Sequence, residues 1–275
     1  MAPGQSRDDD GNLLLGGIST ERLAGTYGTP LLVIDLTVVD EAVAALLAGR
    51  VLVPEVSYAA KAFANVGFFR HLMRHPIGID VCSLGELVTA ERAACAPERL
   101  TMHGAGKTRE ELQAACSGRV GTIIVDGVEE LERVAELCRG GRSPGVMLRL
   151  NVGVEAQTHA HVRTGSDDSK FGIPPRDEVA ALGLLRSHPH LRFAGLHAHV
   201  GSQICRAEPY LATANALLDA ARRFAEGGLP ADRLVIGGGF GVATRPFAAG
   251  ESLDLAATID AVGEHLDRGA RERGL

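Results

Sequence analysis

Lys61 stands at the end of the apolar stretch VSYAAK, residues 56–61, where a charged side chain is costly to bury. The ordinary explanation is a lysine at the end of a strand whose ammonium group reaches water. The alternative is a lysine whose amine stays nucleophilic in a partly desolvated, cation-lined pocket and forms a Schiff base with an aldehyde. The reactive or anion-binding residues predicted near Lys61 decide between these two explanations.

Two histidines on one strand-like stretch are the next candidates. In GLHAHVGSQI, residues 195–204, His197 and His199 lie two positions apart, so both side chains would face the same side of a strand. This spacing fits a packed or hydrogen-bonded pair of imidazoles, and it also fits a metal pair of the HxH type. The turn that follows, with Ser202, offers backbone N–H groups and a hydroxyl group to an anion.

Three consecutive glycines, Gly237, Gly238 and Gly239, follow the apolar stretch RLVI and form a second candidate anion site. Their spacing does not complete the dinucleotide-binding pattern G-x-G-x-x-G, because the sixth position is Val242. Consecutive glycines nevertheless let a backbone approach a phosphate closely. A tight turn explains the same residues equally well, so the glycines alone predict little.

Two further polar stretches are not assigned to a site. HGAGKT, residues 103–108, resembles the end of a phosphate-binding loop, but the first glycine of that motif would fall on Thr101, which excludes nucleotide binding by this route. The segment 149–173 is a long loop of the kind that usually carries function. Its histidines, His159 and His161, are expected to be loop residues rather than metal ligands.

These residues would be positioned by strands that alternate with helices. Short apolar stretches predict strands at 31–35, 53–59, 77–82, 99–104, 121–126, 145–152, 192–200 and 232–238. Apolar residues at i, i+3 and i+4 predict helices at 63–74, 84–95, 108–117, 128–139, 176–188, 208–227 and 255–273. Such alternation is typical of βαβ units and a parallel sheet, and the wholly apolar stretch TIIV is typical of a strand buried on both faces.

The residues that end these strands decide between an open sheet and a barrel. Polar or glycine residues follow nearly every strand, namely Lys61, Asp80, His103, Asp126, Asn151, His199 and Gly237–Gly239. A doubly wound sheet would gather them at one crossover point, whereas a (β/α)8 TIM-type barrel collects them at one end of every strand. We therefore expect a TIM-type barrel. Only seven strands follow residues 31–35, so the eighth is missing, which leaves two open edges and an unfilled core layer.

A lysine, an imidazole and two candidate phosphate cradles on one barrel face predict a cofactor that is a phosphorylated aldehyde. Pyridoxal 5'-phosphate (PLP) is such a cofactor, and its aldehyde condenses with a lysine amine. We therefore interpret Lys61 as the lysine that carries it.

Composition excludes several other classes of protein. The chain has 275 residues, 45% of them hydrophobic, and its net charge of -6 comes from interspersed acids and bases. No basic face predicts a nucleic-acid partner, and no polybasic or long apolar stretch predicts a membrane. The five cysteines contain no CxxC pair, which predicts free thiols in a reducing cytoplasm rather than disulfides or a zinc site. Residues 1–13 are acidic and rich in turn formers, so we expect a disordered lead-in and no signal peptide.

Six stretches occur in the order found in a known family, namely YAAKAF, GIDVCSLGEL, LTMHGAGKT, the segment 149–173, GLHAHVGSQI and IGGGFG. Together they resemble the fold-type III PLP-dependent decarboxylases, and most of all the diaminopimelate decarboxylases among them. The resemblance runs from about Leu14 to the C-terminus. It implies an alanine racemase-like barrel over residues 37–275, preceded by a segment, residues 14–36, whose strand pairs with a C-terminal β-domain.

The resemblance also implies a reaction, in which meso-2,6-diaminopimelate loses CO2 and becomes L-lysine while the pyridinium ring of the cofactor absorbs the electron pair. Lys61 would bind the cofactor covalently, and His199, supported by His197, would stack on its ring. These two, Lys61 and His199, are the implied catalytic residues. The implied cofactor-binding residues are Lys61, Asp80, Arg149, His199, Ser202, Gly237, Gly238 and Gly239, with Arg149 near the phenolic oxygen and Ser202 and the glycines at the phosphate.

The sequence departs from the family in its C-terminal part. In the family, the eighth strand ends in an EPGR-type motif whose Glu pairs with the pyridine nitrogen, and a β-domain follows; this sequence has neither. We therefore expect the chain by itself to bind PLP weakly and to decarboxylate poorly. The resemblance implies a homodimer if the protein is complete; otherwise a second polypeptide would supply the missing C-terminal part. A smaller departure is Ala105-Gly106, where diaminopimelate decarboxylases usually have two Asn.

Three alternatives stay open on the sequence alone. The first is a decarboxylase for another amino acid, such as ornithine, arginine or carrier-bound glutamate, and a panel of substrates distinguishes it. The second is a non-catalytic PLP-binding barrel. The third is a metal hydrolase that uses His197 and His199, which metal analysis would separate from a PLP protein.

Overall fold

The computed structural model describes residues 3–49, 55–140, 143–154, 171–242 and 252–275, and a seven-stranded parallel sheet forms its centre. The strands follow one another around the sheet in chain order, as β4 (Ser57–Ala59), β5 (Gly78–Val81), β6 (Leu100–Met102), β7 (Thr122–Val125), β8 (Gly145–Arg149), β9 (Arg192–Ala198) and β10 (Arg233–Ile236). Each lies within one of the predicted ranges. β7, the TIIV stretch, is buried along its whole length, as expected of a strand covered on both faces.

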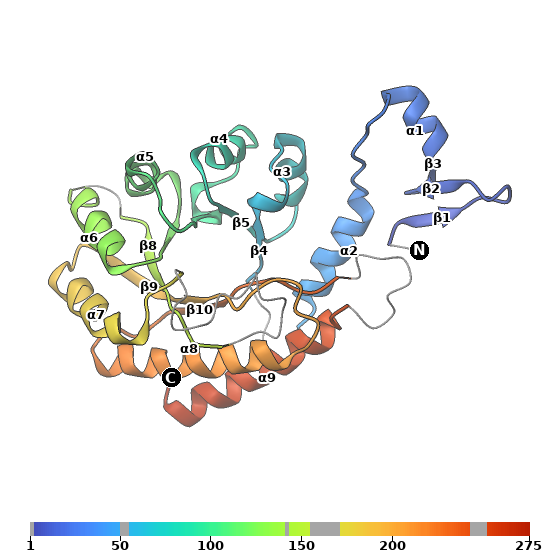
Figure 1. Cartoon of the computed structure of the whole chain (residues 1–275). Helices are drawn as coiled ribbons and strands as arrows, with labels where there is room; N and C mark the ends of the chain where they lie inside the picture. Colours follow the sequence, from blue (N-terminus) through green and yellow to red (C-terminus); the bar gives the residue numbers. More distant parts are fainter. Residues whose placement is uncertain (1–2, 50–54, 141–142, 155–170, 243–251) are drawn as a thin grey trace.

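Helices cover the outer face of the sheet (Figure 1). They are α3 (Val66–Leu72), α4 (Leu84–Arg92), α5 (Arg109–Ala114), α6 (Val128–Leu137), α7 (Glu178–Ser187), α8 (Glu208–Glu226) and α9 (Leu255–Arg273), with short 3-10 turns at Ala60–Ala62, Pro97–Arg99 and Pro175–Asp177. Capping residues fix where two of these helices begin: Ser83 caps α4, and Thr108 forms a capping box with Glu111 at α5. No helix in the described ranges is long and apolar enough to span a membrane.

Most of the hydrophobic core lies between the sheet and the helices. Leu87, Leu131 and Leu217 point inward from three helices and are inaccessible to solvent, as is Ile123 on β7. The inner face of the curled sheet has a much smaller apolar cluster, consisting of Ile124, Met147 and Ala194 with partly buried Val235. Neighbouring residues of β7 thus face opposite sides, as the alternation of a strand requires, and the inner side has little apolar packing.

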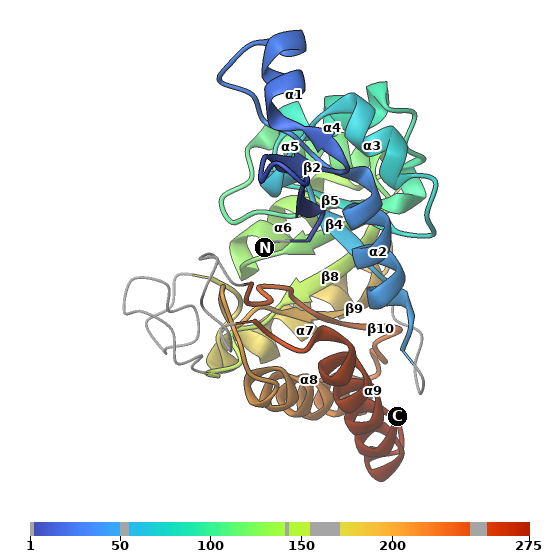
Figure 2. The same cartoon turned by 90° about the vertical axis from the view of Figure 1, so that its right-hand side faces the viewer.

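The sheet does not close into a full barrel among the described residues. β10 and β4 are its two edges, and at their starts Arg233 and Glu55 form an exposed ion pair with an N···O distance of 3.5 Å. The layer of helices is more complete, because α9 lies against both α8 and α2 (Leu36–Leu47) (Figures 1 and 2). Seven parallel strands form a curled half-barrel, which confirms the predicted TIM-type architecture; within the described ranges no eighth strand joins this sheet.

The N-terminal region differs most from the prediction. β1 (Gln5–Arg7), β2 (Leu13–Leu15) and β3 (Ile18–Ser19) form an antiparallel sheet followed by α1 (Thr20–Tyr27), so part of the stretch expected to be disordered forms a paired strand. The strand predicted at 31–35 is not formed, and Asp35 instead caps α2. A strand needs a hydrogen-bonding neighbour, which an apolar sequence alone does not reveal. α2 was not predicted because apolar residues occupy nearly all its positions and hide the helical period.

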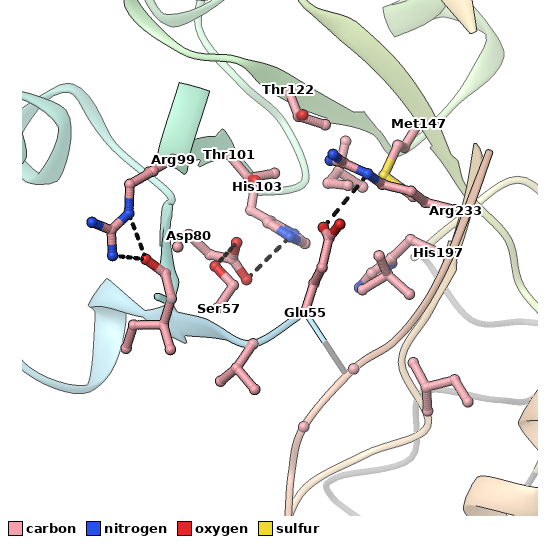
Figure 3. Close-up of a pocket in the computed structure, with 18 of the residues that line it drawn as sticks. Glu55, Ser57, Asp80, Arg99, Thr101, His103, Thr122, Met147, His197 and Arg233 are labelled. Carbon is pink, nitrogen blue, oxygen red and sulfur yellow. Dashed lines mark hydrogen bonds and ion pairs between the residues drawn. The ribbon is translucent and has the colours of Figure 1, made fainter. Parts of the chain in front are cut away.

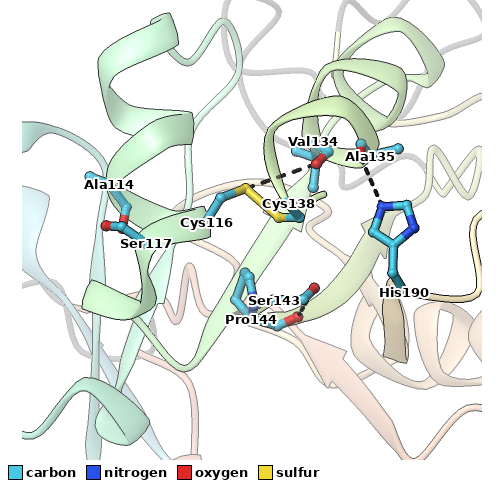
Figure 4. The surroundings of a disulfide bond; sticks show 9 residues. All are labelled: Ala114, Cys116, Ser117, Val134, Ala135, Cys138, Ser143, Pro144 and His190. Atoms are coloured by element: carbon cyan, nitrogen blue, oxygen red, sulfur yellow. Dashed lines mark hydrogen bonds between the residues drawn. A yellow bond between two sulfur atoms is a disulfide. The ribbon is translucent and has the colours of Figure 1, made fainter. Parts of the chain in front are cut away.

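A disulfide bond corrects the prediction that all five cysteines are free thiols. Cys116, in the turn that follows α5, is bonded to Cys138, the residue that caps α6 (Figure 4). Their Cα atoms lie 5.1 Å apart, in the range that a disulfide requires. The two residues are 22 positions apart, so only the packing of α5 against α6 brings them together. Cys82, Cys95 and Cys205 are in no disulfide, as predicted.

Candidate active site

The predicted site residues gather at one end of the sheet because its strands are parallel. In the register of the sheet, Ala59 on β4 pairs with Asp80 on β5, and Arg149 on β8 pairs with His197 on β9. At the other edge, the N–H group of Gly237 donates to the last carbonyl of β9 at 2.8 Å. The carboxyl ends of the strands therefore form a common edge, called the rim below, as expected of this fold.

Asp80 lies between Ser57 and His103 (Figure 3). Its Oδ1 accepts a hydrogen bond from Ser57 Oγ at 2.6 Å, and its Oδ2 lies 3.5 Å from Nε2 of His103. Burial raises the pKa of Asp80 to about 6, although the hydrogen bond from Ser57 and the positive charge of Lys61 lower it. Burial and the charge of Lys107 lower the pKa of His103 to about 3. At neutral pH the contact thus joins a carboxylate to a neutral imidazole and is not an ion pair.

The two histidines of the HAH stretch carry neutral imidazoles. His197 is 4% exposed, its Nδ1 has no hydrogen-bond partner in the described part of the chain, and its ring meets that of His103 edge-on at a centroid distance of 5.0 Å. Burial is the largest cause that lowers the pKa of His197, and it also lowers that of His199 to about 4. Gly237 lies directly against His199, since a Cβ at position 237 would be 2.9 Å from the Cβ of His199.

The two candidate phosphate cradles form one structure. The Ile204 N–H donates to the Gly239 carbonyl at 2.9 Å and the Gly241 N–H to the Ile204 carbonyl at 2.8 Å, so the turns after β9 and β10 are joined by backbone hydrogen bonds. Gly239 has φ of +85°, and a Cβ there would collide with the carbonyl of Gly201. Glycine is therefore required for the close approach of the two turns. Ser202, in the first of them, is exposed.

Arg149 is held on the rim by an acid that was not predicted as a site residue. Its Nη1 donates to Oδ1 of Asp126 at 2.9 Å, and both side chains are largely buried. The other oxygen of Asp126 accepts the N–H of Gly172 at 3.3 Å, and the guanidinium lies 4.8 Å from the centre of the Phe171 ring. Asp126 appears in the sequence only as the end of a strand, and its partner is far away in the chain.

Lys61 lies in the turn directly after β4, and its side chain is exposed. Burial has the largest effect on the pKa values of Asp80, His103 and His199, and the positive charge of Lys61 also lowers each of them. The ammonium group is therefore close enough to act on the titratable groups of the rim while it remains accessible.

A cavity of about 530 Å³ occupies the inside of the curled sheet (Figure 3). Its wall extends from Glu55 and Arg99, near the starts of two strands, to the rim. Among the predicted site residues, Asp80, Gly237 and Gly238 line this cavity, whereas Lys61, Arg149, His199, Ser202 and Gly239 do not. The hollow interior agrees with the unfilled core layer that a missing strand predicts.

Lys107, in the HGAGKT stretch, has a structural position. Its Nζ donates to the carbonyls of Gly104 at 2.7 Å and Ile124 at 2.6 Å, and to Oε1 of Glu130 at 2.6 Å. These three hydrogen bonds use all the donors of an ammonium group. Lys107 therefore fastens the loop after β6 to β7 and α6, which agrees with the absence of a nucleotide-binding motif here.

Residues 42–273 match the family described as "Pyridoxal-dependent decarboxylase, pyridoxal binding domain". The chain belongs to this family. Curated relatives include the diaminopimelate decarboxylase of Bacillus subtilis strain 168, which is 36% identical over 280 residues that cover 96% of this chain and 63% of the relative. The diaminopimelate decarboxylase of Mycobacterium tuberculosis strain H37Rv is 40% identical over 206 residues, which cover 72% of this chain and 45% of the relative.

Solved structures share the fold of this chain. Diaminopimelate decarboxylase from M. jannaschii, in complex with L-lysine, superposes with a TM-score of 0.88 at 23% identity and covers 98% of this chain and 64% of its own. AQ1208 from Aquifex aeolicus gives a TM-score of 0.80 at 26% identity, with 97% and 61% covered. The chain thus spans about half to somewhat under two thirds of the length of the relatives and structures that it matches.

The residues of the rim fit the cofactor of this family, PLP. A Cβ at Gly237 or Gly239 would collide with a neighbouring group, so the joined turns need glycine, and such turns present N–H groups to a phosphate. The neutral imidazole of His199 can stack on an aromatic ring, and the unpartnered Nδ1 of buried His197 can bond a polar group of a ligand.

Sequence reasoning also missed supporting residues. Ser57 precedes Lys61 in the same stretch and bonds Asp80, a role that pairing of neighbouring strands could have suggested. Tyr210 is buried at 1% exposure, and its hydroxyl donates to the carbonyl of Gly238 at 3.4 Å. Tyr210 lies on the first turn of α8, and no sequence pattern connects that turn with the glycines. His159 and His161 lie outside the described residues.

Proposed function

We propose that this chain is the PLP-binding part of an amino-acid decarboxylase that converts meso-2,6-diaminopimelate to L-lysine and CO2. Membership of the decarboxylase family supports the reaction class, and similarity to diaminopimelate decarboxylases supports the substrate. The observation that carries the proposal is the occurrence of Lys61, neutral His199 and the joined glycine turns on one rim. Bound PLP supplies an electron sink for the pair left by the departing carboxylate.

Each predicted residue has a role in this proposal. Lys61 provides the amine that binds PLP covalently, and the uncharged ring of His199 stacks on the cofactor. Ser202 and the turn Gly237–Gly239 bind the phosphate through a hydroxyl group and backbone N–H groups. Arg149, fixed by Asp126, lies near the phenolic oxygen of the cofactor.

Asp80 has a proposed part in controlling charge next to Lys61. With a pKa of about 6, its carboxyl group is mostly ionised at pH 7. Because His103 beside it is neutral, the negative charge of Asp80 is not cancelled by His103 and can act on Lys61. Asp80 therefore attracts the ammonium of Lys61 toward the rim and keeps the amine near the place where the cofactor binds.

Completion of the site by more protein is also proposed. The open edges of β4 and β10 present unpaired backbone groups, which favour pairing with a further strand. Exposed apolar residues such as Leu31 and Leu32 support the proposal that residues 14–36 pack against a β-domain. We propose a homodimer, or a second polypeptide that supplies the remaining part, in the cytoplasm, with a small amino acid as substrate.

Release of CO2 from a panel of amino acids tests the function. The purified chain with PLP is incubated with meso-diaminopimelate, ornithine, arginine or a carrier-bound glutamate, beside a Lys61→Ala control. We expect slow release that is largest with meso-diaminopimelate and absent in the control. Faster release from another substrate would replace the proposed substrate. Firm PLP binding without release from any substrate would point to a non-catalytic PLP-binding barrel.

A further inference from the structure

Asp40, His71 and His75 form a polar cluster between two outer helices. Asp40 belongs to α2, His71 to the last turn of α3, and His75 to the loop that follows α3. The Nε2 atoms of His71 and His75 lie 2.6 and 2.7 Å from the same atom, Oδ1 of Asp40. Within the described ranges, no other three His, Cys, Asp or Glu residues bring their ligand atoms within 4.8 Å of one another. α3 runs back from the rim, so the cluster lies at the opposite end of the sheet.

The donor set of this cluster is that of a transition-metal site. Two imidazole nitrogens and one carboxylate oxygen suit Zn²⁺, Co²⁺, Ni²⁺ and Fe²⁺, whereas Mg²⁺ and Ca²⁺ prefer oxygen ligands alone. An ion bonded to all three atoms at about 2.0–2.2 Å separates ligand atoms by roughly 3.3 Å, so the contacts of 2.6 and 2.7 Å to Asp40 would lengthen by a fraction of an ångström. Each imidazole would bind the ion through the lone pair of Nε2, with its proton on Nδ1.

The ligands stand on fixed backbone. His71 is part of a hydrogen-bonded helix, and the His75 N–H donates to the carbonyl of Leu72 at 3.0 Å. The guanidinium of Arg99 donates to the carbonyl of His75 and also to those of Met73 and Ile77, which fixes the loop after α3. The backbone that carries the two imidazoles is therefore held in place by contacts that do not involve Asp40.

Local charge also favours a cation at this position. The carboxyl end of α3 carries partial negative charge from its last carbonyls. Asp40 Oδ1 lies within 2.7 Å of both imidazole Nε2 atoms, so the three donor atoms already face one point. The side chains of His71 and His75 are 11% and 25% exposed, and that of Asp40 is 45% exposed, so an ion could enter from solvent and keep water in its remaining positions.

We propose that Asp40, His71 and His75 form a binding site for one divalent first-row transition-metal ion. The ion joins α2 to α3, the two helices that flank β4 and the turn with Lys61 in the chain. Because α2 also packs against α9, the site fastens the helix layer beside the open edge of the sheet. The role of the ion is structural. Neither the family nor the proposed decarboxylation requires it, so its test is independent of both.

Zn²⁺ binding to the purified chain tests this proposal. The protein is prepared without a histidine tag, stripped with a chelator and titrated by competition with a chromophoric chelator. The variants Asp40→Asn and His71→Gln remove one ligand each. A matched control is the double variant His188→Gln/His190→Gln, which removes two neighbouring imidazoles that bond backbone carbonyls instead of a carboxylate.

We expect one tight equivalent of Zn²⁺ in the parent and in the control, and binding at least about tenfold weaker in both cluster variants. The melting temperature should rise with Zn²⁺ only where tight binding is kept. Equal affinity in parent and cluster variants would overturn the proposal and leave a hydrogen-bonded cluster only. If a variant does not fold, X-ray absorption at the zinc edge of the parent identifies the ligands of the bound ion. Two imidazole nitrogens with oxygen support the site. Sulfur ligands refute it, because they show that Zn²⁺ is bound by cysteines.

Discussion

Gly237 and Gly238 are adjacent in the chain but have different surroundings. A Cβ at 237 would press on the imidazole of His199, whereas one at 238 would meet nothing within 4 Å. Neither residue has the positive φ that a side chain disfavours. The pair therefore separates the effect of crowding His199 from the general effect of losing a glycine in this turn.

We predict that Gly237→Ala lowers the affinity for PLP by about tenfold or more, because His199 has to move from its place. Overpacking should also cost roughly 1–3 kcal/mol of stability. Gly238→Ala, the control, should change both little. Cofactor titration by absorbance and chemical denaturation measure the two effects. Equal losses in both variants would show that the contact with His199 has no special importance.

The raised pKa of Asp80 predicts a pH dependence of stability in the cofactor-free chain. The folded pKa of about 6 exceeds the ordinary value of 3.8, so the folded state holds more protons between these values and loses stability as pH rises through them. The side chain is 22% exposed, and the total loss is about 3 kcal/mol. The lowered pKa values of His103 and His199 change stability in the opposite direction in both proteins, so the contribution of Asp80 is the difference between parent and Asp80→Asn. Denaturation curves from pH 4 to 7 that stay parallel in parent and variant would refute the assignment.

At the scale of elements, the disulfide joins two helices of the outer layer. Cys116 follows α5 and Cys138 ends α6, so the bond fixes the packing of these neighbours. Because the bond joins two outer helices, we expect it to support the fold and not the chemistry of the rim.

Thiol counting tests the disulfide. We predict that the unreduced, denatured chain titrates three thiols and the reduced chain five, because Cys82, Cys95 and Cys205 are free. Closing a loop over 22 positions should contribute about 3 kcal/mol through the entropy of the unfolded chain. Cys116→Ala/Cys138→Ala should lose that amount, and Cys95→Ala/Cys205→Ala is the control for the count. Five thiols without reductant would mean that the bond does not form.

At the scale of the whole molecule, the sequence predicts the strands of the barrel, but it does not predict the N-terminal region or the contacts between distant residues. The strands from β4 to β10 were predicted because each is a short apolar run between helical repeats, and a local pattern reports burial directly. Residues 31–35 have the same apolar character but no paired neighbour, so they form no strand. The contact of Asp126 with Arg149 and the Cys116–Cys138 bond join residues that are distant in the chain, and one sequence does not contain that information.

The open side of the half-barrel was predicted from the number of strands. Counting strands predicted seven, and the hollow interior and the edges of β4 and β10 agree with that count. The residue types predicted which groups of the rim could react. The pKa values of these groups were not predicted, because they depend on burial. Neutral histidines and a carboxyl group with a pKa of about 6 depend on how deeply each side chain lies, which no motif states.

Covalent attachment of PLP to Lys61 tests the central claim most directly. The chain has only three lysines, Lys61, Lys107 and Lys170, so borohydride reduction with PLP followed by peptide mass spectrometry locates the label without ambiguity. We predict one label, on the peptide that contains Lys61, and none in Lys61→Ala. Label on Lys107 or Lys170, or an unchanged amount in Lys61→Ala, would contradict the account.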